Sequence, residues 1–474
     1  MGESHWAPEV QEFVRGLVAR HDIPGLALVA ARDGAEVYAE GFGVREVGGA
    51  DPTTPDTIFG VASVTKGFTA LAIMQLVEAG KLAVDDPVAR YLPAFRTPDP
   101  DAARATTIHH FLTHTAGLPP LPSRFFALAR ATAGDPFAAP KPAWVADHAP
   151  LDSADDLLAY LAGLDFAPLG PPGAHFSYSN EGFALLGVIA ERVSGRPYAD
   201  YVRAHILDPL GMARSTFDAA ALADLPDVAT LHAACEADGR REVAAAPQRT
   251  YTPLWYPAGG LNTSARDLLR YLEIYRAGGV SGGVRLLSAA GIARMTTPHT
   301  AGGSPRACYG YGLGVIPDYH GVAIIQHGGG SKGIAAQVMV ARGAGYTGAA
   351  LANLAEVPTD RAALAPLNRI LGRPADSKLV EYQDAAYPPE QRCRYVGTYQ
   401  GGEGQHLTVT LEDGRLVWTI GGKTPPARPV GDHAFVLTTP SGEVYARFLL
   451  HADRPAWAVA MGSRIVPRAA DTPA

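Results

Sequence analysis

The fold is decided by residues 59–80, which read FGVASVTKGFTALAIMQLVEAG. This apolar run predicts a buried helix, with Ser63 capping its first turn and Gly80 supplying the left-handed residue at its C-terminal end. Ser63 and Lys66 are three positions apart, so a helix would place the amine within reach of the hydroxyl. Burial shifts a lysine toward its neutral form, in which it can act as a base for a serine nucleophile.

The composition is that of an ordinary soluble globular protein. The chain has 474 residues, a formal net charge of -7 and 18% charged residues, and is long enough for more than one domain. This mild acidity, without a basic run or a nucleic-acid-binding motif, argues against a nucleic-acid partner. Residues 1–8 show no secretion signal and no apolar run is long enough to span a bilayer, so we expect no membrane partner and a cytoplasmic location.

Neither a metal nor a cofactor is expected. Cys235, Cys308 and Cys393 are widely separated and odd in number, which predicts free thiols rather than disulfides or a zinc cluster. His110 and His114 lie four apart on an expected helix and could in principle bind a metal. The glutamate of an H-E-x-x-H motif and a third ligand are missing, however, so a structural role in the surrounding turn is favoured.

The hydrophobic pattern predicts an α+β fold in which a mostly antiparallel sheet is flanked by helices and joined to an all-helical region. Both ends of the sheet-forming part supply strands, at 25–32 and 36–41 around the turn Asp33-Gly34, and at 322–326, 335–340 and 347–353. Helices are expected at 7–21, 154–163, 181–194, 264–277 and 358–372. Residues 119–150 are rich in Pro and Ala, which indicates loops and short helices beside the site.

The C-terminal part has a different pattern. Residues 373–390 carry several prolines and charges and look like a linker. After them, short strands alternate with turns such as Asp413-Gly414, which predicts a small all-β barrel. We therefore expect a main domain over 1–372, a linker over 373–390 and a C-terminal barrel over 391–474.

Three separated motifs carry the chemistry. They are Ser63-Val64-Thr65-Lys66, Tyr178-Ser179-Asn180 and His327-Gly328-Gly329. In order and spacing they resemble the penicillin-binding-protein and class C β-lactamase superfamily of serine hydrolases, with His in place of the Lys of the third motif. The resemblance covers residues 10–370 and implies the β-lactamase/transpeptidase-like fold.

The resemblance also implies roles for these residues. Ser63 would be the nucleophile and Lys66 its proton acceptor. Tyr178 would share the role of the base if Lys66 and His327 lower its pKa. Asn180 would hold the acyl-side carbonyl or amide of the substrate, and His327 would lie on an edge strand facing the hydroxyls.

The glycines of the third motif would serve the backbone of the site. Gly328 and Gly329 would let the substrate approach the strand closely. The backbone N–H groups of Ser63 and Gly330 would form the oxyanion hole, in which one donor is worth about 2.7–4 kcal/mol. The helix at Ser63 is expected to lie at the seam between the helical region and the sheet, its N-terminus pointing into the pocket.

Proteins of this superfamily act on several substrates. The resemblance implies hydrolysis of a small-molecule ester, amide or short peptide through an acyl-Ser63 intermediate, with carboxylesterase or D-amino-acid-specific peptidase favoured. The alternatives are a β-lactamase or DD-carboxypeptidase, a penicillin-binding-protein-type thioesterase or peptide cyclase, and a non-catalytic binding protein. The C-terminal part resembles the lipocalin-like appendages of some members, as a folding partner, a lid over the pocket or an oligomer contact. The oligomeric state stays open.

Two other motifs match known patterns but lack the setting that those patterns need. Residues 279–283 and 329–333 match the G-x-S-x-G pattern of α/β-hydrolases, yet neither Ser281 nor Ser331 has the strand before it and the helix after it that a nucleophile elbow needs. Residues 310–314 superficially look like a nucleotide-binding loop. They lack the βαβ setting, so we expect the start of a strand beside the pocket.

Overall fold

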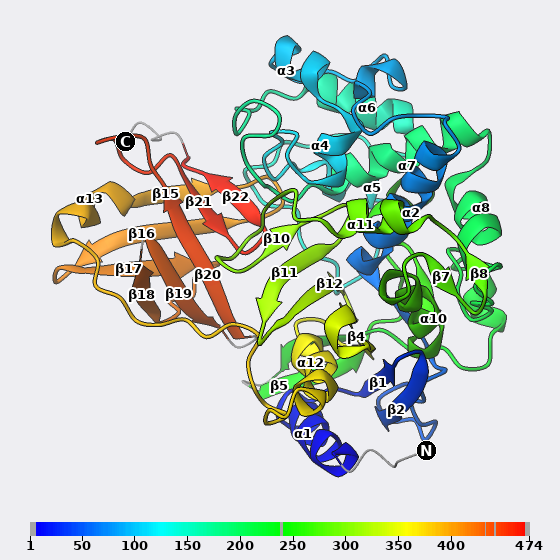
Figure 1. The fold of residues 1–474 in the computed structure, drawn as a ribbon. Coiled ribbons are helices and arrows are strands. Elements are labelled where there is room, and N and C mark those ends of the chain that lie inside the picture. The colour runs from blue at the N-terminus through cyan, green and yellow to red at the C-terminus, as the bar shows by residue number, and fades with distance from the viewer. Residues whose placement is uncertain (1–5, 238–239, 432, 440–441, 470–474) are drawn as a thin grey trace.

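A computed structural model describes residues 6–237, 240–431, 433–439 and 442–469. Its main sheet is antiparallel throughout and uses strands from both ends of the first 352 residues. The strand order is β2 (Ala35–Gly43), β1 (Gly25–Arg32), β14 (Tyr346–Ala352), β13 (Ile334–Ala341), β12 (Val322–Ser331), β11 (Gly314–Tyr319), β10 (Cys308–Tyr309) and β9 (Thr300–Ala301). The α+β prediction with a mostly antiparallel sheet is confirmed (Figure 1).

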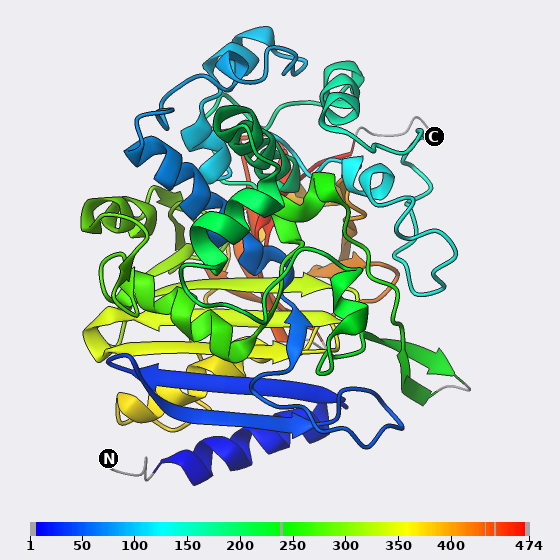
Figure 2. The same ribbon diagram turned by 90° about the vertical axis from the view of Figure 1, so that its right-hand side faces the viewer.

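The sheet is covered on both faces, so its central strands β13 and β14 are buried at every position. Along β1, Leu26 and Leu28 belong to one core while Ala27 and Val29 belong to the other, as the two-residue period of a strand requires. The first core contains helices α1 (Ala7–Arg20) and α12 (Thr359–Ile370), and the second contains α10 (Ala265–Arg276) and α2 (Thr65–Glu78). This layering is visible in Figure 1 and Figure 2.

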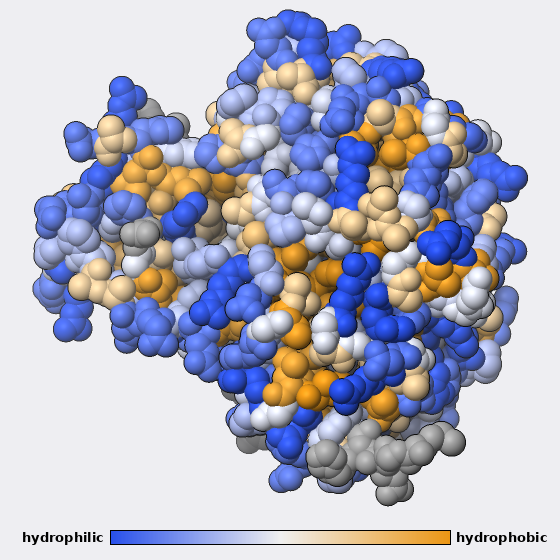
Figure 3. Space-filling model, viewed as in Figure 1, coloured by the Kyte–Doolittle hydropathy of each residue, from blue (hydrophilic) through white to orange (hydrophobic). Residues whose placement is uncertain are grey.

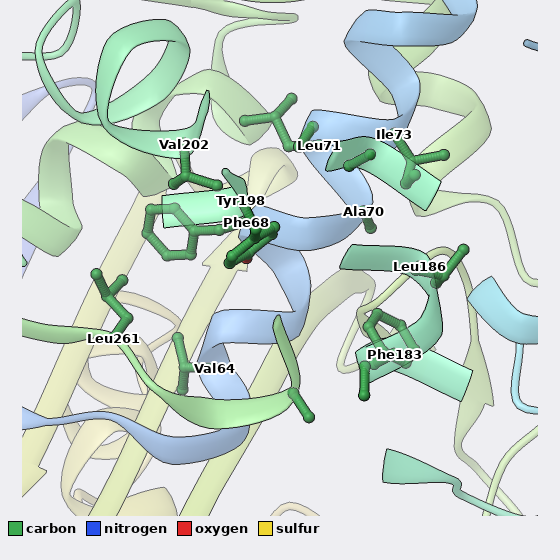
Figure 4. Close-up of a cluster of buried hydrophobic side chains, with 14 of the residues drawn as sticks. Val64, Phe68, Ala70, Leu71, Ile73, Phe183, Leu186, Tyr198, Val202 and Leu261 are labelled. Atoms are coloured by element: carbon green, nitrogen blue, oxygen red, sulfur yellow. The ribbon is translucent and has the colours of Figure 1, made fainter. Parts of the chain in front are cut away.

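Helix α2 is buried almost all round, which is why its sequence shows no polar face. Phe68 is fully buried and stacks on Tyr271 with ring centroids 3.7 Å apart. Figure 4 shows side chains of α2 among those of α7 (Asn180–Ser194) and α8 (Tyr198–Val202). A helix held this way is a rigid support for the residues at its N-terminal end.

The two ends of α2 differ from each other in how well the sequence predicts them. Gly80 adopts a φ of +67°, so the left-handed residue is confirmed. The prediction that Ser63 caps the helix is wrong. Ser63 lies inside a 3₁₀ turn, Ala62–Val64, and the cap position falls at Val64 without a side-chain hydrogen bond. The Ser63 hydroxyl is therefore left available for other contacts.

The remaining predicted helices of the main region are found close to their expected ends. They are α1, α6 (Ala154–Gly163), α7, α10 and α12. Ser264 caps α10 by accepting a hydrogen bond from the Asp267 amide. The β1–β2 turn has positive φ at both Asp33 and Gly34, as the sequence predicts for a tight hairpin. The segment 119–150 contains the short helix α5 (Ser123–Ala127) between loops.

The C-terminal strands form two antiparallel sheets and, within the described residues, no closed barrel. One sheet has three strands, β15 (Gly397–Gln400), β16 (His406–Glu412) and β17 (Arg415–Ile420). The other has β18 (Ala427–Gly431), β19 (Ala434–Thr439), β20 (Gly442–Leu449), β21 (Ala458–Met461) and β22 (Arg464–Pro467). A single bridge between Tyr399 and Arg468 joins them. The short strands predicted here are thus present, together with the short helix α13 (Arg392–Tyr395), whereas the barrel is not confirmed.

This C-terminal part has its own apolar core, centred on Trp418, Phe435 and Phe448. Figure 1 shows it in orange and red beside the main body, with β22 and β21 close to β10. No helix or strand lies between α12 and Pro389, where the linker is expected. The division of the chain into domains at 372 and 391 stays a prediction.

The surface has an ordinary mixed character on the face that Figure 3 shows, where hydrophobic residues are interspersed with hydrophilic ones. In the part of the chain that the structure describes, no helix combines the length and the apolar character needed to cross a membrane.

Candidate active site

The turn that carries Ser63 is strained and firmly held. Ala62, just before it, has a φ of +43°, a left-handed conformation that L-residues with a β-carbon rarely adopt. The Thr65 hydroxyl donates to the Ala62 carbonyl at 2.7 Å and accepts from the Leu261 amide at 3.2 Å. These bonds fix the turn, and Ser63 stands partly exposed on it.

Lys66 is fully buried and points at Ser63. Its Nζ lies 3.3 Å from the Ser63 Oγ, 2.8 Å from the Asn180 Oδ1 and 2.6 Å from the Ala258 carbonyl oxygen. Burial, and then the charge of Arg464, hold the pKa of Lys66 well below its usual range. The predicted pairing of Ser63 with a lysine biased toward its neutral form is therefore present.

The second motif enters the site at the start of α7. Ser179 is the N-cap of this helix, and its hydroxyl accepts from the Gly182 amide at 3.2 Å. Tyr178 precedes the cap and Asn180 begins the helix, so both side chains are placed by a well-defined helix end. The Lys66 Nζ lies 4.7 Å from the centroid of the Tyr178 ring. The structure thus brings Ser63, Lys66, Tyr178 and Asn180 together.

Tyr178 differs electrostatically from its expected state. Burial raises the pKa of Tyr178 above its ordinary value, and the neighbouring Ser63 hydroxyl and Arg464 guanidinium oppose this rise only in part. Tyr178 would share the role of the base only if Lys66 and His327 lowered this pKa, and that condition is not met. The Tyr178 hydroxyl is buried without a hydrogen bond of ordinary geometry to the described residues. It is a neutral phenol that can donate a proton.

The third motif lies on β12, which is not an edge strand as predicted. The first half of β12 pairs with β11, but this pairing ends at Gln326. From His327 to Ser331 the strand pairs only with β13, so an edge facing away from β13 is open within β12 itself. β12 is therefore an interior strand of the sheet that has a free edge along its second half, because β11 is short.

Gly329 is the point at which β12 touches the Ser63 turn. A β-carbon at Gly329 would lie 2.1 Å from the Val61 carbonyl oxygen and 3.3 Å from the Ser63 amide nitrogen. Only glycine allows the strand to approach this turn so closely. A β-carbon at Gly330 would have no neighbour within 4 Å. Close contact therefore explains the glycine at 329 but not the one at 330.

We expect Gly329→Ala to lower activity far more than Gly330→Ala. The added methyl group at Gly329 forces the strand away from the Ser63 turn, and a displacement of about 1 Å at a catalytic group can cost roughly 100-fold in rate. Alanine at Gly330 keeps the backbone N–H and has space. Steady-state kinetics with an activated ester measure both variants. Equal losses in the two would contradict the close contact at Gly329.

His327 is tied into a chain of hydrogen bonds with His114 and Tyr309. The Ser179 amide donates to His114 Nδ1 at 3.0 Å, and His114 Nε2 lies 3.2 Å from the Tyr309 hydroxyl. That hydroxyl lies 3.0 Å from His327 Nε2, while His327 Nδ1 lies 2.6 Å from the Gly328 carbonyl oxygen. Burial holds the pKa of His114 well below 6.5 and lowers that of His327 to about 4, so both rings are neutral.

The contacts at the two ends of this series of hydrogen bonds determine the direction in which each group donates. His114 accepts at Nδ1, so its proton is on Nε2 and is donated to Tyr309. Tyr309 then donates to His327 Nε2, and the His327 proton is on Nδ1, facing a carbonyl. For His114 the sequence predicts only a structural role in its own turn. The sequence offers no signal that a left-handed residue, with φ of +58°, would reach the third motif.

We expect the His327 imidazole not to titrate between pH 5 and pH 8. Its pKa is about 4 because burial and the nearby Lys66 disfavour the cation. An unfolded histidine binds its proton below pH ~6.5, so lowering the pH from there toward 4 weakens the folded state. Long-range ¹H–¹⁵N spectra, with His327→Gln for assignment, measure this. A His327 signal that titrates near pH 6.5 would contradict the neutral ring.

Two further residues reach this site from the C-terminal part. Arg464 lies with its guanidinium carbon 4.5 Å from the centroid of the Tyr178 ring. Its Nε donates to Glu403 Oε2 at 2.6 Å, and Glu403 Oε1 accepts from Asn180 Nδ2 at 3.1 Å. Sequence reasoning missed both residues, since neither belongs to a recognisable motif.

A cleft of about 420 Å³ opens over these groups. It is lined by Ser63, Tyr178, His327, Gly328 and Arg464, among others. Polar side chains from the helix start, the sheet and the C-terminal part therefore converge on one cavity. A serine that lines such a cleft, with a buried base beside it, is suited to acyl transfer.

The rival sites are not formed. Ser281 ends the two-residue strand β7 (Val280–Ser281) of a short hairpin, and Ser331 is followed by the turn into β13. Gly314 begins β11 beside the cleft, as predicted for residues 310–314. Among the described residues, no group of three or more His, Cys, Asp or Glu side chains could hold a metal ion, and the three cysteines are free.

Comparison with known proteins gives one family. The family model described as Beta-lactamase matches residues 10–373. Penicillin-binding protein 4 of Amycolatopsis lactamdurans is 31% identical over 366 residues, which cover 74% of this chain and 85% of that protein. Esterase EstB of Burkholderia gladioli is 35% identical, over 53% of this chain and 66% of its own. The octameric penicillin-binding protein homologue from Pyrococcus abyssi superimposes with a TM-score of 0.69 at 28% identity, over 97% of this chain and 99% of its own.

Proposed function

The chain belongs to the beta-lactamase family, and from this premise we propose that it is a serine hydrolase that cleaves a small ester through an acyl-Ser63 intermediate. The observation that carries the proposal is the position of Lys66, whose buried amine faces the Ser63 hydroxyl at 3.3 Å. The relatives called a penicillin-binding protein and an esterase support the reaction class. Substrate and catalytic residues are our assignment.

The contacts of Lys66 fit a neutral amine. An uncharged amine has two N–H donors and one lone pair. Two of its three neighbours, the Asn180 Oδ1 at 2.8 Å and the Ala258 carbonyl at 2.6 Å, can only accept. The lone pair is then left for the third neighbour, the Ser63 hydroxyl. This is the arrangement that a general base needs before it takes a proton.

In the proposed reaction, the Ser63 Oγ bonds to the substrate carbonyl carbon as its proton passes to Lys66. The carbonyl oxygen becomes an oxyanion, held by the backbone N–H groups of Ser63 and Gly330. When the tetrahedral intermediate collapses, the ester C–O bond breaks. The leaving alkoxide takes a proton from Lys66, with Tyr178 as the neutral hydroxyl able to relay it. Water then attacks the acyl group, which releases the acid and restores Ser63.

The charges of the cleft favour an uncharged substrate. His327 is neutral and its Nε2 is occupied by Tyr309. Lys66 is biased toward its neutral form, and Arg464 is paired with Glu403. Among the described residues that line the cleft or contact Ser63, no cation is left unpaired to receive a carboxylate. A β-lactam or DD-peptide carries such a carboxylate, so an ester fits better, with a neutral D-amino-acid amide second.

Turnover of three substrate classes tests the proposal. We expect hydrolysis of p-nitrophenyl acetate and butyrate, weaker hydrolysis of D-alanyl p-nitroanilide, and little hydrolysis of a carboxylate-bearing cephalosporin. Covalent labelling with a fluorophosphonate, followed by peptide mapping, should find Ser63. A protein that turns over none of these substrates and forms no adduct at Ser63 would support the alternative of a binding protein.

A further inference from the structure

Glu403 and Arg464 form an ion pair that belongs to the C-terminal part but is buried against the catalytic motifs. We infer that these two are positioning residues of the active site, which orient Asn180 and set the charge around Lys66. The inference rests on the proposed function, since it concerns the base that activates Ser63. Neither residue touches Ser63 by a hydrogen bond among the described contacts, so both act through other residues.

The backbone near Arg464 is fixed to the second motif. The turn between β21 and β22 is closed by Gly462 and Ser463, and the Ser463 carbonyl accepts from the Tyr178 amide at 2.9 Å. The Ile465 amide donates to the Ser177 hydroxyl at 3.3 Å. Residues flanking Arg464 are thus bonded to residues flanking the start of α7. The guanidinium is held over Tyr178 by this docking.

The backbone near Glu403 is fixed in the same way. The turn between β15 and β16 brings Gly402 against the loop after α4 (Ile108–Leu112), where its amide donates to the Pro120 carbonyl at 2.8 Å. A β-carbon at Gly402 would lie 2.7 Å from the Pro122 nitrogen. Such close packing leaves Glu403 little freedom, and its side chain is only 6% exposed.

Glu403 determines which way the Asn180 amide faces. The carboxylate can only accept, so at 3.1 Å it requires the NH₂ group of Asn180 on its side. The Asn180 oxygen is thereby turned to Lys66 at 2.8 Å. With its N–H donors directed at Asn180 and Ala258, Lys66 presents its lone pair to Ser63. The carboxylate therefore acts on the base through one amide.

Arg464 makes the buried carboxylate tolerable. It binds Glu403 through Nε at 2.6 Å and through Nη2 at 3.2 Å, a two-pronged contact typical of strong arginine–carboxylate pairs. Burial acts to raise the pKa of Glu403, but Arg464, with Arg124 and Gln405, outweighs it and the pKa lies below its ordinary value. Both members are charged, and breaking such a buried pair leaves one charge uncompensated.

The pair has opposite effects on Lys66. The titratable and charged groups that face Lys66 are Tyr178, Glu181, His114, His327, Glu403 and Arg464. After burial, Arg464 is the largest influence that lowers the pKa of Lys66, whereas Glu403 and Glu181 raise it. Removing the Arg464 charge should therefore move the acidic limb of the activity profile to higher pH. Removing the Glu403 charge should move it to lower pH.

The test is the rate of fluorophosphonate labelling at Ser63 as a function of pH, measured on the full-length protein. We expect Arg464→Met to shift the acidic limb up, and Glu403→Gln to shift it down, each by about one pH unit, which is tenfold in rate on that limb. Arg464→Lys should restore the parent profile. Glu403→Ala, which also loses the acceptor for Asn180, should show the same downward shift of the limb as Glu403→Gln and should label about tenfold more slowly on the plateau above the limb.

The matched control is the pair Arg428 and Glu443, which lies in the same C-terminal part at 3.1 Å and contacts none of the catalytic motifs in the described structure. Arg428→Met and Glu443→Gln should leave the profile unchanged. Thermal unfolding identifies any variant that does not fold. If Arg464→Met or Glu403→Ala does not fold, the conservative variants Arg464→Lys and Glu403→Gln still test the inference. Limbs that do not move, or that move in the same direction for both charges, overturn the inference. A parent protein that is not labelled overturns the proposed function, and the inference with it.

Discussion

Ser63→Ala is expected to lower ester turnover by about four to six orders of magnitude and to abolish covalent labelling. The loss is large because Lys66 then has no nucleophile to activate. Without a covalent step, the backbone donors have no oxyanion on an acylated serine to stabilise. Stability should hardly change, since Ser63 is partly exposed and its hydroxyl does not cap the helix. Steady-state kinetics, intact-protein mass spectrometry after fluorophosphonate treatment, and thermal unfolding measure these three effects.

The chain offers two control serines for this experiment. Ser281 and Ser331 stand in the other serine motifs, at the end of a short hairpin strand and at the end of β12. Alanine at Ser281 should leave turnover and labelling near the parent values. Alanine at Ser331 should leave the adduct on Ser63. A protein that loses its adduct with Ser331→Ala but keeps it with Ser63→Ala would contradict the assignment of the nucleophile.

The sequence predicts the parts of this site that depend on local spacing. Ser63 and Lys66 share one turn of chain, and Tyr178 and Asn180 flank one N-cap, so the geometry of a helix end is enough to place each pair. The alternation of apolar residues predicts the central strands and hence the antiparallel sheet. The pattern predicts correctly that His327 lies on a strand but wrongly that this is an edge strand, because it does not show that β11 pairs with the first half of β12.

The missing parts depend on contacts between distant segments. Glu403 lies 223 positions from Asn180 along the chain, and no local pattern indicates that a turn of the C-terminal part would reach it. The prediction that Ser63 caps the helix is wrong for a different reason. A 3₁₀ turn held by Thr65 precedes the helix, and nothing in the local sequence indicates the positive φ of Ala62 on which this turn depends. The pKa of Tyr178 depends on burial, which follows only from the packed structure.

Lys66→Met is expected to reduce kcat by roughly 100- to 10,000-fold, the usual contribution of a general base, with a smaller effect on KM. Methionine has a similar length and no lone pair of comparable basicity, so Ser63 keeps its surroundings but loses its proton acceptor. The acidic limb of the pH profile should vanish as well, because the group that titrates there is gone. Kinetics between pH 5 and pH 10 measure both effects.

Lys332 is the matched control for this variant. It is also a largely buried lysine, with its side chain 10% exposed, but it pairs with Asp135 and belongs to the turn after β12 rather than to the catalytic motifs. Lys332→Met should therefore cost stability, because Asp135 loses its partner in a buried site, while its pH profile keeps the acidic limb. Lys66→Met should lose the acidic limb but should not cost stability, since it removes an amine whose burial is unfavourable. An acidic limb that persists in Lys66→Met would mean that a group other than Lys66 takes the serine proton.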